Sequence, residues 1–97
     1  MYKILEKRRL NETVTLMRVH APYVARSAQP GQFIILRIDE NGERIPLTIA
    51  GYDREEGWVM IIFQLVGATT RLLDQLEEGE DILDFVGPLG KASEFEG

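Results

Sequence analysis

Trp58-Val-Met-Ile-Ile-Phe-Gln-Leu-Val66 is the strongest strand signal in the chain, because most of its residues are β-branched or aromatic. Such residues suit the pleated, half-buried surface of a β-sheet. The stretch is much shorter than the roughly 20 apolar residues that a membrane-spanning helix needs. It therefore predicts a buried β-strand, and we expect no membrane association.

Further strands are predicted on the N-terminal side of this stretch, where apolar residues recur between turn signals. They cover residues 2–10, 13–19, 32–38 and 45–52. The turns between strands are marked by Asn11-Glu12, Pro30-Gly31 and the Asn-Gly pair within residues 39–42. Residues 21–30 lack periodicity and contain two prolines, so this segment is interpreted as a connection.

The pattern changes to helical spacing after the strongest strand. Leucines recur at positions 72, 73 and 76, either Thr69 or Thr70 can cap the start, and Gly79 suits a left-handed C-terminal cap. One short helix is predicted at about 69–78. A last strand follows over residues 81–86 and is expected to end at Gly87-Pro88.

These elements predict one domain of the all-β class, with six antiparallel strands and one short helix between strands five and six. So many short strands must hide their edges, and closure into a barrel achieves this. The helix is expected to cover one end of the barrel.

Composition excludes several kinds of function. The net charge of −5 argues against nucleic-acid binding. The chain has no cysteine and its single His20 has no neighbouring ligands, so no metal site is predicted. Absence of cysteine is compatible with the reducing cytoplasm, where we expect the protein. Residues 53–97 carry a net charge of −8, which indicates either a solvated surface or a docking face for another protein.

Arg44-Ile-Pro-Leu-Thr48 is a candidate ligand site at the start of a predicted strand. The planar guanidinium of arginine matches phosphate oxygens, proline limits backbone freedom where a flat ligand lies, and threonine can bond a ring nitrogen. Arginine and proline are also common at strand starts, so a purely structural role stays open.

Gly67-Ala-Thr-Thr70 is a second candidate, at the predicted start of the helix. Small residues allow a ligand close to the backbone, and the free N–H groups of a first helical turn favour phosphate. Simple helix capping is the alternative. One strand and one hairpin separate this motif from Arg44, so both can face a common ligand.

The motifs follow one another in a distinctive order: Pro30-Gly-Gln-Phe33, Arg44-x-Pro-Leu-Thr48, Gly67-Ala-Thr-Thr70 and Gly87-Pro-Leu-Gly90. The last of them, taken alone, is a strand terminator. Together they resemble the flavin domain of the ferredoxin–NADP reductase superfamily over essentially the whole chain. Two groups are most similar: the small flavoprotein subunit of NADH-dependent reduced ferredoxin:NADP oxidoreductase, also called sulfide dehydrogenase, and the electron-transfer subunit of dihydroorotate dehydrogenase.

This resemblance implies a six-stranded antiparallel Greek-key barrel that binds FAD. Arg44 would meet the FAD phosphates, Pro46 and Leu47 would lie along the isoalloxazine ring, and Thr48 would reach its N5 edge as the catalytic position. The wider superfamily usually has tyrosine where Leu47 stands, which favours the two narrower groups. The other cofactor-binding positions implied are Ile62, Phe63, Gln64, Gly67, Ala68, Thr69 and Thr70.

The resemblance further implies that residues 1–97 are one domain of a longer flavin-dependent NAD(P)H oxidoreductase. A C-terminal nucleotide-binding domain and an iron–sulfur cluster would lie outside this sequence, and this piece alone is expected to be inactive with NAD(P)H. Expected partners are a larger oxidoreductase subunit or a ferredoxin. A non-catalytic barrel that binds a protein partner is the alternative, because small barrels host many functions.

Overall fold

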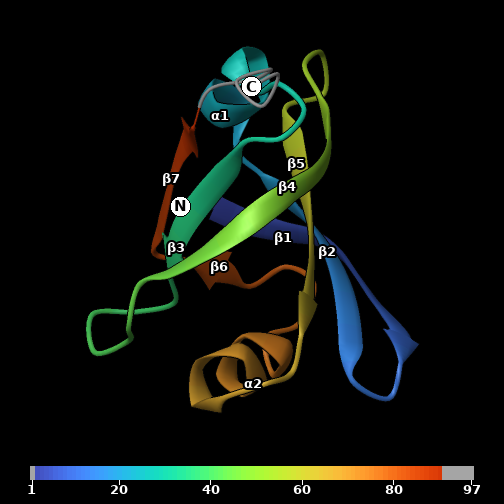
Figure 1. The fold of residues 1–97 in the computed structure, drawn as a ribbon, viewed down its shortest axis with the longest axis vertical. Coiled ribbons are helices and arrows are strands. Elements are labelled where there is room, and N and C mark those ends of the chain that lie inside the picture. The colour runs from blue at the N-terminus through green and yellow to red at the C-terminus, as the bar shows by residue number, and fades with distance from the viewer. Residues whose placement is uncertain (1, 91–97) are drawn as a thin grey trace, which may run out of the picture.

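The computed structural model describes residues 2–90, which form seven strands and two short helices (Figure 1). The strands are β1 (Tyr2–Asn11), β2 (Val14–His20), β3 (Phe33–Arg37), β4 (Ile45–Asp53), β5 (Trp58–Gln64), β6 (Asp81–Ile82) and β7 (Asp84–Leu89). The helices are α1 (Pro22–Ser27) and α2 (Ala68–Asp74).

All strand pairs are antiparallel, in the order β6-β1-β2-β5-β4-β3-β7. β3, β4 and β5 follow one another as neighbours, and β2 lies beside β5, which is a Greek-key arrangement. β6 pairs with one edge strand, β1, and β7 with the other, β3, so a single C-terminal segment nearly closes the barrel. The predicted all-β barrel is confirmed.

The number of strands differs from the prediction because the last strand is divided in two. The predicted strand 81–86 is interrupted at Leu83, whose N–H donates to the Ile38 carbonyl at 3.2 Å. The segment changes its partner there from β1 to β3, and this change ends β6 and begins β7. Gly87-Pro88 does not end the strand as predicted, but lies within β7.

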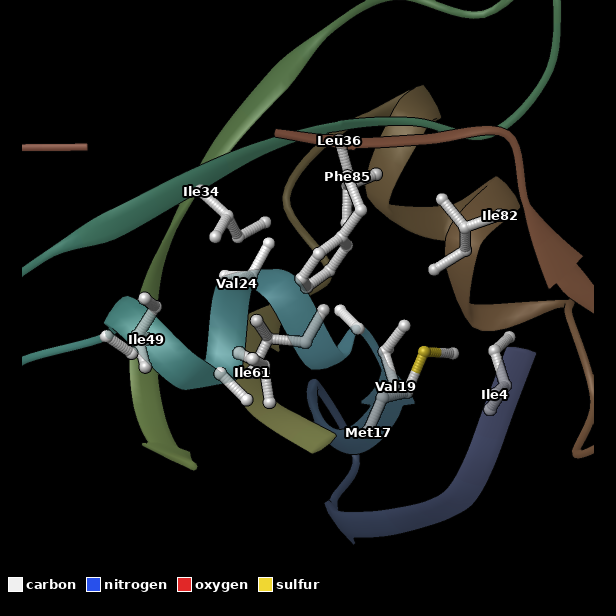
Figure 2. Packing of buried hydrophobic residues seen from close by; sticks show 14 of the residues in the cluster. Ile4, Met17, Val19, Val24, Ile34, Leu36, Ile49, Ile61, Ile82 and Phe85 are labelled. Carbon is white, nitrogen blue, oxygen red and sulfur yellow. The ribbon is translucent and has the colours of Figure 1, made fainter. Parts of the chain in front are cut away.

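The core lies inside the barrel and is built from alternate residues of facing strands. Ile34 and Leu36 of β3 and Val59 and Ile61 of β5 are fully buried. Phe85 reaches into this cluster from β7 (Figure 2). The alternation places every second side chain of these strands outside the core.

α1 corrects the interpretation of residues 21–30 as a connection without regular structure. Pro22 occupies the first turn, where its missing N–H is harmless, and Val24 and Ala25 are buried in the core. The helix has only six residues, which is too few for a visible 3.6-residue period. Together with the barrel strands, α1 covers the end opposite to α2 (Figure 1).

α2 ends at Asp74, earlier than the predicted helix of about 69–78. Leu73 is fully buried, so α2 covers the other end of the barrel, as expected. The chain leaves the helix to reach β1: Gly79 donates its N–H to the Ile4 carbonyl and Ile4 donates to the Glu80 carbonyl, both at 2.8 Å. These bonds with β1 replace the last helical turn.

Candidate functional site

β4 changes its partner in the middle of its length. Ile49 pairs with Ile61 of β5, and the β4–β5 pairs continue from there toward Asp53. Residues 45–48 pair with β3, and residues 62–64 of β5 pair with β2. The two strands therefore separate beyond Ile49, with β4 running to the β3–β4 hairpin and β5 running to α2 (Figure 1).

Backbone groups of β4 face the space that this separation leaves. Ile49 donates its N–H to the Gln32 carbonyl at 2.9 Å, so its polar groups point toward the β3 side. Direction alternates along an antiparallel strand, so the Thr48 N–H and the Pro46 carbonyl point toward β5. Pro46 has no N–H to leave unpaired, which suits such an edge. Both groups lie beyond the last β4–β5 pair and can hold a ligand's polar edge.

The side chains along this separation fall into two sets. Pro46, Thr48, Ile62 and Gln64 are exposed, and a ligand can reach them. Leu47 is half-buried and packs against the core. Phe63 is only 3% exposed and belongs to the core cluster. Its side chain therefore points away from any ligand in this gap, so a contact at this position is limited to the backbone.

Arg44 lies directly before β4, and its guanidinium is exposed. Within residues 2–90 this guanidinium has no hydrogen-bond or ion-pair partner, whereas Arg37 on the neighbouring strand is paired with Asp84 at 2.8 Å. A free cation of this kind is available for an anionic ligand.

The β3–β4 hairpin, which carries Arg44, contacts the start of α2. The Thr69 hydroxyl donates to the Glu43 carboxylate, with 3.3 Å between Oγ1 and Oε1. The two motifs singled out in the sequence, at 44–48 and 67–70, therefore meet at the same end of the barrel.

The start of α2 combines local capping with an open backbone. The Thr70 hydroxyl accepts the N–H groups of Val66 and Gly67 at 3.0 and 3.1 Å, so this side chain acts as a cap. Gly67 has an extended backbone that any residue can adopt, and a Cβ added there would meet nothing within 4 Å. The first intrahelical bond runs from the Arg71 N–H to the Gly67 carbonyl, which leaves the N–H groups of residues 68–70 without helical partners.

A hollow of about 410 Å³ lies between the hairpin and α2, and the sequence analysis did not single out most of the residues around it. Its lining residues are Ile38, Asp39, Asn41, Gly42, Glu43, Thr69, Leu72, Gln75, Leu76 and Glu80. Three carboxylates make it unfavourable for phosphate.

The Pro30–Phe33 motif borders β4, because Phe33 pairs with Thr48, and it also lies beside the Gly87–Gly90 motif. They contact each other, since the Gln32 side-chain amide donates to the Gly90 carbonyl at 2.7 Å. Gly87 has a φ of +156°, and an added Cβ would lie 2.8 Å from Ile34 Cγ2. These two motifs shape the β3–β7 pairing, and Phe33 also lies beside Thr48 of the candidate site.

Comparison with known proteins identifies the chain's relatives. A Clostridium beijerinckii protein described as an uncharacterized protein in the adh 3′ region is 57% identical over 95 residues, which cover 98% of this chain and 32% of that protein. A Thermotoga maritima homologue of the dihydroorotate dehydrogenase B (NAD(+)) electron transfer subunit is 46% identical over 94 residues, covering 97% and 33%. A chain in the structure of NADH-dependent reduced ferredoxin-NADP oxidoreductase superposes with a TM-score of 0.94 at 45% identity, covering 97% and 34%. The chain belongs to the ferredoxin reductase-like family.

This ferredoxin reductase-like chain spans about a third of the length of the relatives that it matches. The cytochrome b5 reductase domain of Ulva prolifera nitrate reductase has the same fold, with a TM-score of 0.70 at 18% identity over 92% of this chain and 40% of that one. No protein-family model matches the chain.

Two observations concern residues 2–90 of the ferredoxin reductase-like domain. No group of three or more histidine, aspartate or glutamate side chains there is arranged to hold a metal ion. Neither helix in the described part is long and apolar enough to cross a membrane.

Proposed function

We propose that the chain is an FAD-binding, electron-transfer domain that holds the FAD diphosphate between Arg44 and the start of α2. The observation that carries this proposal is the Arg44 guanidinium, which has no partner within residues 2–90 and directly follows Glu43, whose carboxylate accepts a bond from Thr69 at the start of α2. A guanidinium and a first helical turn are both favourable for phosphate. The names of the relatives support the same assignment.

We propose that the flavin ring lies in the separation between β4 and β5. Pro46 and Thr48 supply a backbone carbonyl and N–H along one side, and Ile62 and Gln64 supply exposed side chains on the other. Leu47 supports this side from the core, while Phe63 offers only its backbone. Ala68, Thr69 and Thr70 would surround the phosphates together with Gly67. FAD, when bound, supplies the redox chemistry, and the residues position it.

Thr48 is the proposed residue nearest to the reactive edge of the ring. Its hydroxyl is exposed and its N–H faces the open side of β4. A hydrogen bond from either group would orient the ring and adjust its polarity. The residues around this separation include no side chain that we assign as a general acid or base.

In a longer protein, this domain would pass electrons between NAD(P)H, FAD and an iron–sulfur partner. NAD(P) and the iron–sulfur cluster would bind outside the present sequence, and the partner would be a larger oxidoreductase subunit or a ferredoxin. The domain alone would then bind FAD without oxidising NAD(P)H. We expect it to work in the cytoplasm.

Flavin titration tests the proposal. FAD is added to the purified chain, and quenching of flavin fluorescence gives the dissociation constant. We expect saturable binding of one FAD per chain, and no oxidation of NADH or NADPH by the complex. Absence of saturable binding, with the fold intact by circular dichroism, would contradict the proposal and favour a barrel that binds a protein partner.

A further inference from the structure

Thr15 is a fully buried polar residue inside the barrel, on the face of β2 that also buries Met17 and Val19. A hydroxyl at such a position is unfavourable unless it is hydrogen-bonded. It donates to Asp74 Oδ1 at 2.6 Å and accepts a bond from Arg9 Nε at 3.1 Å. The polar residue at this core position is therefore explained by its contact with Asp74.

Asp74 is the last residue of α2, where the helix dipole disfavours a carboxylate. Its side chain is only 13% exposed and forms an ion pair with the Arg9 guanidinium. The Lys7 ammonium donates to the Asp74 backbone carbonyl. Contacts with β1 and β2, and not helix propensity, account for an aspartate at this position.

α2 has seven residues, too few for a helix that is stable by itself. Its orientation depends on what holds it to the barrel, and its last residue is bound by Arg9 and Thr15. Its first turn follows Gly67 and carries the proposed phosphate contacts. A shift at Asp74 would therefore also displace this first turn, where we propose that the phosphates bind.

We propose that Arg9, Thr15 and Asp74, here called the Asp74 cluster, are positioning residues that set the affinity for the FAD diphosphate through the orientation of α2. This inference rests on the proposed function, because it assigns a role to residues that do not touch the ligand. It predicts a loss of affinity that depends on the ligand's phosphates.

Two substitutions at one position separate the hydroxyl from the shape of the side chain. Thr15→Val removes the hydroxyl and keeps the volume, whereas Thr15→Ser keeps the hydroxyl. We expect Thr15→Val to weaken FAD binding by about tenfold, equivalent to about 1.4 kcal/mol, and to leave the affinity for riboflavin, which has no phosphate, unchanged. Thr15→Ser should retain FAD binding.

Arg8 and Arg9 provide a matched pair of neighbours on β1. Arg8 pairs with Glu6 on the outer face, while Arg9 bonds Asp74 and Thr15. Arg9→Gln and Arg8→Gln change the charge equally, and only Arg9→Gln should weaken FAD binding. If Thr15→Val does not fold, this pair still tests the inference.

Amide hydrogen exchange without flavin gives a readout that does not depend on the proposed function. Arg9→Gln should accelerate exchange at Arg71 and Leu72 of α2 relative to Ile61 of β5, and Arg8→Gln should not. Equal acceleration in α2 and β5, or equal loss of FAD and riboflavin affinity, would mean a general loss of stability and would overturn the inference. If the wild-type chain binds no FAD, the proposed function fails, and the exchange result alone decides whether the cluster orients α2.

Discussion

The Thr69 hydroxyl and the Glu43 carboxylate lie 3.3 Å apart and join the start of α2 to the β3–β4 hairpin. Glu43 immediately precedes Arg44, whose guanidinium has no partner within residues 2–90. This contact between residues 26 positions apart therefore brings the hairpin that carries Arg44 to the start of α2. This arrangement is the basis of the flavin assignment.

Replacing Arg44 with alanine should weaken FAD binding without changing stability. Loss of a charge-assisted hydrogen bond costs about 1.5–3 kcal/mol, or at least about tenfold in affinity. The unfolding midpoint in urea should stay the same, because this guanidinium has no partner in the described part of the chain. Arg26→Ala, at the α1 end, is the control. Equal FAD affinity in both variants would remove Arg44 from the site.

Replacement by alanine should weaken ligand binding at Gly67 and lower stability at Gly87. A Cβ at Gly67 meets nothing within 4 Å, so Gly67→Ala should change stability by less than about 1 kcal/mol but obstruct the ligand. Gly87→Ala should destabilise by more than about 1 kcal/mol, because its Cβ would lie 2.8 Å from Ile34 Cγ2 at a φ of +156°. Urea unfolding and FAD titration on both variants test this. Unchanged FAD affinity in Gly67→Ala would argue against close approach of the phosphates.

Thr48 should influence the flavin's redox potential more than the fold. One hydrogen bond contributes about 1 kcal/mol, and for a two-electron couple this corresponds to about 20 mV. Thr48→Val should shift the midpoint potential of bound FAD by about this amount, while Thr48→Ser retains the wild-type value. Equal potentials in all three proteins would place the Thr48 hydroxyl away from the ring's reactive edge.

The pKa of Glu6 is held below its ordinary value of 4.5 by hydrogen bonds from Arg8 and Arg18. Because the pKa of Glu6 is lower in the folded state, its hydrogen bonds with Arg8 and Arg18 stabilise the protein above pH 4.5. This contribution is lost as the pH falls through the lowered value. In Arg8→Gln, the pKa of Glu6 should rise toward 4.5, and NMR titration of the Glu6 carboxyl would measure this change. The stability difference between Arg8→Gln and wild type should vanish in acid, and a difference that persists there would have another cause.

Local pattern was sufficient for the strands and insufficient for the contacts between them. The β5 sequence predicts its own strand, because β-branched residues dominate it. The division at Leu83 follows from pairing with two distant strands, and the burial of Thr15 is offset by Asp74, 59 residues away. No window of sequence contains both members of such pairs.

The sequence also predicted some parts of the candidate site and not others. Arg44 and Gly67 were identified from residue type, because a guanidinium and a small residue suit phosphate wherever they lie. Phe63 was assigned a ligand contact through the family resemblance, although strand alternation turns its ring into the core. The separation of β4 from β5 depends on the whole sheet, and its only local sign is Pro46.

Comparison of FAD with riboflavin in the wild-type chain and in Arg44→Ala tests most directly whether Arg44 binds the FAD diphosphate. The difference in binding free energy between the two ligands measures what the phosphates and adenosine contribute. We predict that the wild-type chain binds FAD more tightly than riboflavin and that Arg44→Ala loses at least about tenfold of this preference, equivalent to about 1.4 kcal/mol. An unchanged preference in Arg44→Ala would contradict the account.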